Sequence, residues 1–476
     1  MRAHRTRTEG PGLGHRRRGP ASRHPRRRRR GGREVGPGLT RPSKSPRQVV
    51  EIVDLIRRNP DFRKLLLASV ASFLGDWFAL VAVSSLVAEQ TGSDGSTALV
   101  FAAQVLPIFF VAPLAGVVAD RFDRKRMMAG SAWLRVVPAL GLLAASALGQ
   151  AWIAYLCVVS ISALAAFYEP VVAAVLPNIV DDQDLSLGQT VLSSVWGTML
   201  FLGAGIGGLV TAWLGRDASF LINAATFAVA GLLVAGVTRP FRTGEVVAPA
   251  SMVAHLGEVW RFVRPRKVTK AFMLTKPGVG VGNGIVGLLP IYALRVFDAG
   301  DAGIGILLAA RGLGVLVGPY IGRRLMSADG RRHVFIAGAS IVTYAVAYAF
   351  LPSAPTLWLA AACVFLAHVG GGHQWVASTY GLQLTTPDRL RGRVMALEFG
   401  FATLASGISA ILAGIAAELL GLRATSYLLA GASLTYAVTW LVWTRDLWAS
   451  PGDPVADAQR ALAYGTPTMT SPAEHA

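Results

Sequence analysis

The sequence contains few cysteines and few charged residues. Only two cysteines, Cys157 and Cys363, occur among 476 residues, and both lie inside long apolar runs. We expect them to pack as small apolar side chains, so neither a disulfide framework nor a cysteine-ligated metal site is predicted. Only 15% of the residues are charged, whereas 53% are hydrophobic. This composition excludes an ordinary soluble protein and predicts a chain largely surrounded by lipid.

Several catalytic signatures are also missing. Neither H-E-x-x-H nor G-x-S-x-G occurs, and the polar segments between apolar runs are too short for a separate catalytic domain. No lysine follows a glycine, so the chain has no G-K-S/T phosphate loop. We therefore expect neither an enzyme nor an ATP-driven pump, and we predict no cofactor and no metal.

Acidic residues are scarce, and the basic excess is concentrated at one end. The first 64 residues hold 20 of the 46 Lys and Arg but only five Asp and Glu, which places +15 of the formal +19 there. Residues 1–60 are predicted to be a disordered cytoplasmic tail that contacts anionic lipid or has no function. A nucleic-acid partner is not expected, because the basic stretch has no aromatic residue for stacking. The order of basic and apolar residues is also unlike a cleavable signal peptide.

Twelve apolar runs are long enough to cross a membrane as helices, which takes about 20 residues each. They cover residues 65–88, 97–119, 127–148, 152–176, 191–214, 218–237, 271–294, 303–322, 333–351, 357–380, 394–420 and 424–443. With the N-terminus in the cytoplasm, the cytoplasmic turns hold 18 Lys and Arg and the outer turns three, Arg216, Arg295 and Arg423. This asymmetry predicts an all-α protein of the plasma (inner) membrane with both termini in the cytoplasm.

The chain repeats itself, which predicts two halves of six helices. The segment 214–221, which leads into the sixth run, resembles 420–428, which leads into the twelfth. The predicted organisation is a six-helix bundle over 61–237, a cytoplasmic linker over 238–270, a second bundle over 271–444 and a cytoplasmic tail over 445–476. The linker has helical apolar spacing at Val253, Leu256 and Val259, as in a helix that lies on a membrane surface. Two such halves suggest alternating access between them.

The turn after the second run carries a motif that resembles the signature of a known family. Gly116 is followed by Asp120, Arg121, Asp123, Arg124 and Lys125 in a pattern that resembles the G-x-x-x-D-R-x-G-R-R/K gating loop of the major facilitator superfamily. Asp123 stands where that pattern has its second glycine. A partial second copy with Gly318, Gly322 and Asp329 follows the eighth run, so the repeat extends to the gating loops.

Three further stretches, 59–63, 75–77 and 387–394, resemble the macrolide-efflux and enterobactin-exporter branch of that superfamily. Gly203, Gly207 and Gly208 are similar to its G-P-x-x-G-G antiporter motif, although Ala204 replaces the proline. These glycines would also serve plain close packing of helices. The resemblance implies proton-coupled efflux of a small amphipathic molecule by a monomeric carrier in contact with membrane lipids. Facilitated uptake, lipid-related transport and a non-transporting receptor remain alternatives.

In the facilitator fold, helices 1, 4, 7 and 10 line the central cavity, and here they carry Asp76, Glu169, Lys276 and the pair His368 and His373. Asp76 lies about 16 Å along its helix at 1.5 Å per residue, close to the bilayer centre. We expect it to be the proton site, with a helix–helix hydrogen bond as the alternative. The two histidines are candidates for a proton relay or for packed, hydrogen-bonded groups.

Four other ionisable residues in the predicted helices are expected to act in structure or gating. Arg135 and Glu169 lie at similar depths in neighbouring helices and should form an ion pair, unless Glu169 reaches the arginines of the gating loop. Lys276 and Glu398 lie nearer the cytoplasm, so either snorkelling or an inner-gate ion pair is expected. Arg311 is deeper, and it should either bind an anionic group or neutralise a carboxylate.

Overall fold

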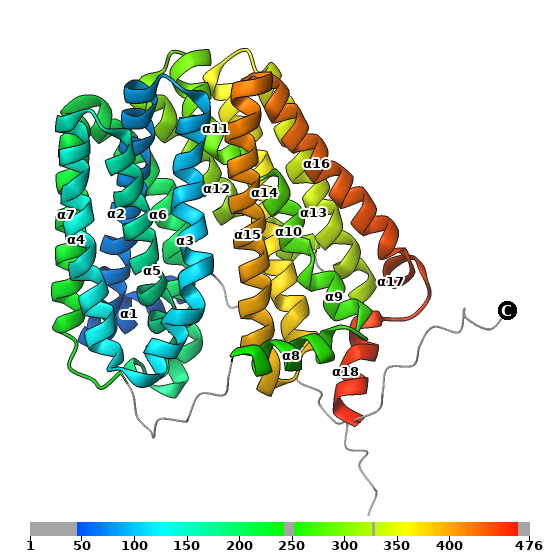
Figure 1. Ribbon diagram of the computed structural model, residues 1–476. Helices are drawn as coiled ribbons and strands as arrows, with labels where there is room; N and C mark the ends of the chain where they lie inside the picture. Colours follow the sequence, from blue (N-terminus) through cyan, green and yellow to red (C-terminus); the bar gives the residue numbers. More distant parts are fainter. Residues whose placement is uncertain (1–44, 242–251, 326–328, 465–476) are drawn as a thin grey trace, which may run out of the picture. The chain divides into compact units, whose positions relative to one another are not determined.

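The computed structural model describes residues 45–241, 252–325 and 329–464. The chain divides into two compact units, Met1–Gln48 and Val49–Ala476. The described residues form helices joined by short turns, which agrees with the predicted all-α class (Figure 1). Residues 1–44, which make up most of the predicted Arg-rich tail, lie outside the described residues.

The prediction of disorder as far as residue 60 was wrong for its last part. Residues Ser45–Arg58 form helix α1. Leu55 is fully buried in a core cluster with Phe62 and Leu65, and Arg58 Nη2 donates to Asp184 Oδ1 at 2.5 Å. Apolar residues at helical spacing therefore give this segment a face that packs against the bundle, which the basic composition of the tail concealed.

Six helices form the N-terminal half: α2 (Pro60–Thr91), α3 (Asp94–Arg121), α4 (Arg124–Leu148), α5 (Ala151–Ile179), α6 (Leu185–Leu214) and α7 (Arg216–Ala235). Their ends follow local chemistry. Asn59 caps α2 by accepting from Phe62 N, and Asp123 caps α4 by accepting from Arg126 N. Gly92 ends α2 with φ of 62°, a left-handed conformation that favours glycine.

The C-terminal half begins with a broken helix and continues with five long ones. Its elements are α9 (Lys267–Met273), α10 (Thr275–Gly282), α11 (Ile285–Ile291), the π-helical turn η2 (Tyr292–Val296), α12 (Gly300–Leu325), α13 (Gly330–Phe350), the 3₁₀ turn η3 (Leu351–Ser353), α14 (Leu357–Thr385), α15 (Asp388–Leu420) and α16 (Leu422–Trp443). The seventh predicted run thus falls into four pieces, because Pro277 and several glycines interrupt it.

Short helices flank the C-terminal half. The linker contains α8 (Met252–Val263), as its apolar spacing predicted, and Glu258 on α8 pairs with Arg389 and Arg393 at the start of α15. After α16 come α17 (Arg445–Ala449) and α18 (Pro454–Tyr464). Asp453, just before α18, accepts from Gly330 N at the start of α13. Both α8 and the C-terminal segment are therefore attached to this half.

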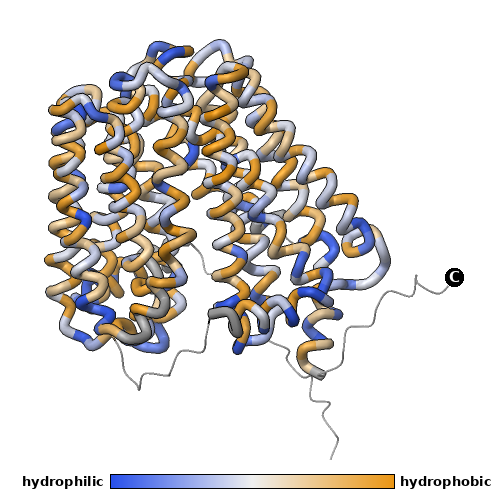
Figure 2. Tube along the Cα trace, viewed as in Figure 1, coloured by the Kyte–Doolittle hydropathy of each residue, from blue (hydrophilic) through white to orange (hydrophobic). Residues whose placement is uncertain are grey.

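Ten segments of the described chain have the length and apolar composition of a membrane-crossing helix. Figure 2 shows hydrophobic residues along these helices and hydrophilic residues at their ends. The two predicted runs that fall short are on α14 and α16, which have 29 and 22 residues. Polar residues such as His368 and Gln374 lower the mean hydropathy of α14, and serines and threonines lower that of α16. A count of twelve membrane-spanning helices therefore stays a prediction.

Two helix pairs make the most extensive contacts between the halves, α3 with α15 and α6 with α12, and α11 also packs against α3. Glycines line the second contact. A Cβ atom on Gly208 would lie 2.7 Å from the Cα of Gly305, so the two backbones meet directly. Gly203 and Gly207 face α2 instead, where a Cβ would lie 3.1 Å from Trp77 Cβ and from Phe78 Cα, respectively. The three glycines of the antiporter-like motif thus permit close packing of helices.

Candidate functional site

The first buried ion pair lies in the N-terminal half. Arg135 on α4 is 1% exposed, and its Nη2 donates to Asp76 Oδ1 on α2. Its Nη1 donates to Ser72 Oγ at 2.7 Å, and its guanidinium carbon lies 3.9 Å from the centre of the Phe227 ring on α7. The guanidinium is thus held by three helices, and the charge that it neutralises is that of the predicted proton site.

This pairing differs from the predicted pair of Arg135 with Glu169. The side chain of Glu169 lies outside the described residues, so nothing follows about its own contacts. Arg135 reaches α2 because helices α2, α4 and α7 pack against one another. Depth along a helix alone could not identify Asp76 as the partner, because this pairing depends on how α2 packs against α4.

The second buried ion pair lies in the C-terminal half. Lys276 Nζ on α10 is 2.7 Å from Glu398 Oε2 on α15, and the side chains are 4% and 1% exposed. Lys276 also donates to Thr379 Oγ1 at 3.1 Å, and Ser378 donates to Glu398 Oε1. The structure therefore brings the predicted partners together and buries the lysine rather than letting it snorkel. Because both partners belong to one half, this pair does not close a gate between the halves.

Arg311 on α12 is buried without an acidic partner among the described residues. It is 7% exposed, and its Nε donates to His368 Nε2 at 3.3 Å, whereas its Nη1 has no hydrogen-bond partner in the described part of the chain. Since a guanidinium can only donate, His368 Nε2 must accept. The Nδ1 of His368 lies 3.1 Å from Val364 O, so this ring is neutral with its proton on Nδ1. Such a fixed tautomer suits a positioning group better than a proton relay.

The second histidine is separate from the first. His373 is 5% exposed, and neither of its ring nitrogens has a hydrogen-bond partner within the described chain. It packs against Gly322 of α12, where any Cβ atom would collide with the ring, and beside Gly318. Two glycines from the second gating-loop copy therefore make room for His373. No hydrogen bond between described residues links it to His368.

The gating-loop motif is described only in part. The surroundings of Gly116 and the side chains of Asp120 and Arg121 are not among the parts that the structure describes. Beyond them, Lys125 Nζ donates to Val237 O at 2.7 Å, and Arg124 Nη1 lies 3.4 Å from Ala174 O. The loop is therefore attached to the ends of α5 and α7.

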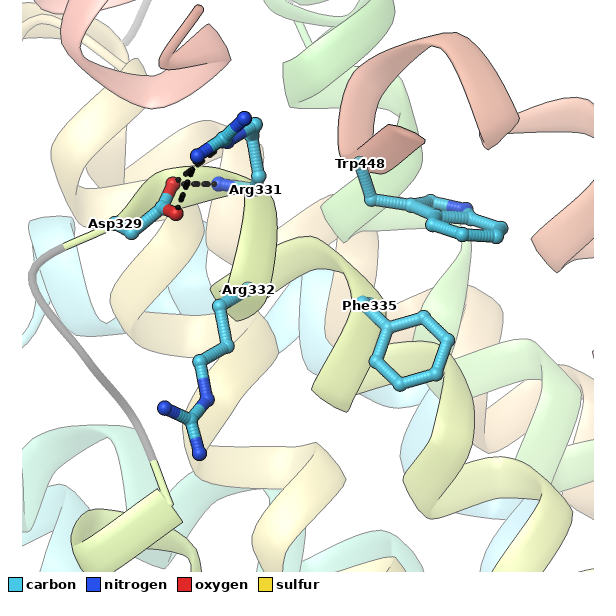
Figure 3. A pocket seen from close by; sticks show the side chains of 5 residues that line it. All are labelled: Asp329, Arg331, Arg332, Phe335 and Trp448. Carbon is cyan, nitrogen blue, oxygen red and sulfur yellow. Dashed lines mark hydrogen bonds and ion pairs between the residues drawn. The ribbon is translucent and has the colours of Figure 1, made fainter. Parts of the chain in front are cut away.

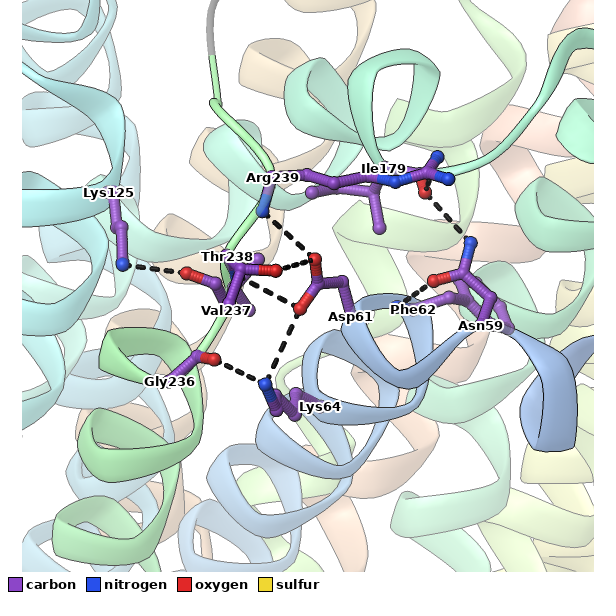
Figure 4. A network of polar contacts seen from close by, with 10 residues as sticks. All are labelled: Asn59, Asp61, Phe62, Lys64, Lys125, Ile179, Gly236, Val237, Thr238 and Arg239. Atoms are coloured by element: carbon purple, nitrogen blue, oxygen red, sulfur yellow. Dashed lines mark hydrogen bonds and ion pairs between the residues drawn. The ribbon is translucent and has the colours of Figure 1, made fainter.

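A network around Asp61 joins this loop to the start of α2 (Figure 4). Asp61 accepts from Thr238 N at 2.9 Å, from Thr238 Oγ1 at 2.7 Å and from Arg239 N at 2.9 Å. Lys64 Nζ lies 3.5 Å from the same carboxylate and also donates to Gly236 O. The carboxylate thus holds the chain as it leaves α7, at the end of the bundle that the charge asymmetry predicts to face the cytoplasm.

Replacing Asp61 with asparagine should destabilise the N-terminal half. An amide has one acceptor oxygen, and its NH₂ group would face donors, so at least one of these partly buried hydrogen bonds is lost, at a cost of about 1 kcal/mol. We expect the midpoint of thermal unfolding in detergent to fall by several degrees. Asp388→Asn is the matched control, because Asp388 is exposed and its ion-pair partner, Arg391, is three residues away on the same helix. Equal midpoints for Asp61→Asn and the control would contradict this role.

A polar latch joins the halves at the opposite, predicted outer end. Glu418 of α15 accepts from Gly95 N at 2.7 Å and from Ser93 Oγ, next to the start of α3. Arg295, after α11, pairs with Asp94 at 2.5 Å and donates to Gly92 O. Sequence reasoning missed this latch. The only available signal was a few charged residues in the predicted outer turns, and no spacing rule pairs residues more than 200 positions apart.

Neutralising the latch should open that end more often. In Glu418→Gln, an exposed charge-assisted contact is lost, which is worth up to about 1 kcal/mol and thus roughly a fivefold shift between conformations. We expect a cysteine at buried Thr97 to react several-fold faster with an impermeant maleimide added from outside. Glu89→Gln is the control, because Glu89 pairs with Arg216 inside one half. Unchanged labelling in Glu418→Gln would show that the latch does not hold the halves.

The described residues also line two pockets of different kinds. One is a surface hollow lined by Asp329, Arg331, Arg332, Phe335 and Trp448 (Figure 3). Its carboxylate accepts from Arg331 N and Nη2 at 3.0 Å, and these bonds lower the pKa of Asp329. The other is a small, mostly apolar cavity between the halves, and its lining includes Leu80 and Phe101 from one half and Val286 and Leu308 from the other. Only the second lies near the buried charges, since Phe101 also contacts Arg311.

Comparison with known proteins agrees with this architecture. A family model described as the transmembrane secretion effector, of the MFS type, matches residues 57–453. The multidrug efflux pump Tap of Mycobacterium tuberculosis is 28% identical over 367 residues, which cover 73% of this chain and 84% of that protein. The uncharacterised MFS-type transporter YkuC of Bacillus subtilis is 22% identical over 371 residues, or 74% of this chain and 84% of its own.

Solved transporter structures share the fold at low identity. A variant of the nucleoside transporter NupG matches with a TM-score of 0.66 and 14% identity, covering 80% of this chain and 99% of that one. A bacterial homologue of the human lysosomal transporter Spinster, in its inward-facing occupied conformation, matches with a TM-score of 0.64 and 14% identity, covering 86% and 100%. At these identities the likeness concerns the fold alone.

Proposed function

Because the chain belongs to the transmembrane secretion effector family of major facilitator transporters, we propose that it is a proton-coupled exporter of small amphipathic molecules. That it is a multi-pass membrane transporter and not an enzyme follows from the family. Export, proton coupling and an amphipathic substrate are the proposal. The relatives named as multidrug efflux pumps support export of drug-like molecules.

The observation that carries the proposal is the buried pair of Asp76 and Arg135. A carboxylate that neutralises a buried guanidinium can bind a proton only if the ion pair is broken, so protonation changes the charge balance between α2 and α4. Arg135 remains attached through Ser72 and Phe227. A proton on Asp76 would therefore remove the charged contact between α2 and α4, while the hydrogen bond to Ser72 on α2 still holds the arginine. Such a change can bias an equilibrium between two arrangements of the halves.

The proposed arrangement in the membrane follows from charge and packing. Twelve spanning helices, counting α14 and α16, would place both termini and the Asp61 network in the cytoplasm and the Glu418 latch outside. In this orientation the observed latch corresponds to a state that is closed towards the outside. We propose a monomer in the bacterial inner membrane, in contact with lipid and driven by the proton gradient.

Everted membrane vesicles test this function directly. Energised vesicles that contain the protein should take up drug-like substrates from a panel, and substrate addition should release protons from the lumen, as reported by a pH-sensitive dye. Vesicles with an empty vector are the control. Uptake that occurs only in right-side-out vesicles would replace export with import. Substrate movement that neither follows a pH gradient nor dissipates one would remove proton coupling.

A further inference from the structure

Arg311 is a buried cation in a position where a bound ligand would touch both halves. Lys276 and Arg135, the other two nearly fully buried cations of the described helices, each have a carboxylate within salt-bridge distance. Arg311 has none among the described residues, and its single polar contact there is with neutral His368. An uncompensated buried charge is costly, and breaking a buried ion pair by removing one partner typically costs 3–5 kcal/mol. A cation kept in this state needs an anion that the described chain does not supply.

A second unsatisfied donor lies beside it. Trp77 of α2 is 6% exposed, its ring centre lies 5.7 Å from the Arg311 guanidinium carbon, and its Nε1 has no acceptor in the described residues. Buried indole N–H groups usually find a hydrogen-bond partner. Trp77 belongs to the N-terminal half and Arg311 to the C-terminal half. One oxygen anion placed between the two groups could accept from both and would bridge the halves.

The surroundings indicate the rest of the ligand. Phe101 lies 5.7 Å from the guanidinium carbon and also lines the small cavity between the halves, together with Leu80 and Leu308. Trp196 packs edge-on against Trp77, with ring centres 6.0 Å apart. One cationic group among aromatic and aliphatic side chains suits a molecule with one negative charge and an apolar body.

We propose that Arg311 and Trp77 form a binding site for the carboxylate of an amphipathic organic monoanion, the class of molecule that the protein exports. The carboxylate accepts from Arg311 Nη1 and from Trp77 Nε1, and the apolar part of the ligand contacts Phe101. His368 positions the guanidinium by accepting from its Nε. This inference rests on the proposed function and adds the chemical class of its substrate.

The test compares 1-naphthoate with the neutral, nearly isosteric 1-naphthamide. Binding to purified protein in detergent is measured from the ligand dependence of the unfolding midpoint, since a ligand of the folded state raises it. Charged hydrogen bonds predict that naphthoate binds roughly tenfold to a hundredfold more tightly than naphthamide. In Arg311→Gln this preference should vanish, while affinity for naphthamide stays the same.

Trp77→Phe keeps the inference testable if Arg311→Gln does not fold. It retains an aromatic face but lacks the N–H donor, so it should lose several-fold in affinity for naphthoate and little for naphthamide. Trp196→Phe, in the same aromatic pair, should keep the preference. Equal binding of the two probes by wild type, or stabilisation by chloride equal to that by naphthoate, would overturn the inference. Binding needs no gradient, so a failure of proton-driven export in vesicles would count against the proposed function alone.

Discussion

Asp76→Asn is expected to abolish proton-coupled transport while substrate still moves down its own gradient. Asparagine has nearly the same size, and its Oδ1 can still accept from Arg135, but it cannot bind and release a proton. Substrate-driven proton flux in everted vesicles should therefore disappear, and exchange of labelled for unlabelled substrate should persist. Both rates are measured in one preparation, with the pH dye for protons and labelled substrate for exchange.

The same substitution leaves Arg135 buried without a counter-charge, so loss of function through misfolding must be separated from loss of coupling. The double variant Asp76→Asn with Arg135→Gln removes both charges and preserves the balance. It should fold at least as well as the single variant and remain uncoupled. Uphill efflux by the double variant at nearly the wild-type rate would eliminate the proton role of Asp76. His373 and Glu169 would then be the remaining candidates for the proton site.

Glu398→Gln should destabilise the protein more than any other single change discussed above. It leaves the ammonium group of Lys276 buried and unneutralised, and breaking one partner of such a pair costs roughly 3–5 kcal/mol. The remaining contacts of that ammonium, with Thr379 Oγ1 and the Trp375 ring, cannot replace the charge. We expect a large drop in the unfolding midpoint, measured in detergent without ligand.

Two further variants test whether the unpaired charge of Lys276 causes that drop in the unfolding midpoint. Glu398→Gln combined with Lys276→Met removes both charges, and it should recover most of the lost stability. Arg331→Gln breaks the exposed pair with Asp329 and should change the midpoint little. If the double variant were as unstable as Glu398→Gln alone, the loss would come from packing around Ser378 and not from the unpaired lysine.

Local patterns predicted most helices, because an apolar run of about 20 residues and its capping residues are read along the chain. The break of the seventh run was not predicted, although Pro277 and the neighbouring glycines that cause it are visible in the sequence. Helix α1 was missed because its apolar face is hidden in a basic composition. The identity of the partner of Arg135 could not be predicted, since it depends on how α2, α4 and α7 pack.

The sequence predicted which residues belong to the candidate site, but it did not predict which of them contact one another. Depth along a helix identified Asp76, Arg311 and His368 as unusual groups near the bilayer centre. It could not show that Arg311 lacks a carboxylate while Trp77, from the other half, lacks an acceptor. Both facts arise from contacts between distant segments, and hydropathy carries no information about them.

In the proposed orientation, the latch of Glu418 and Arg295 also makes the protein sensitive to the salt concentration outside the cell. The side chain of Arg295 is 44% exposed and that of Asp94 is 21% exposed, so mobile ions can screen their attraction. The screening length falls from about 10 Å at 0.1 M salt to about 3 Å at 1 M. The cations of the two internal pairs, Arg135 and Lys276, are only 1% and 4% exposed, so these pairs are screened much less. If the latch faces outward as proposed, external salt weakens the closure of that end while leaving the internal charge pairs intact. The carrier would then open outward more readily in a cell in concentrated salt than in one in fresh water.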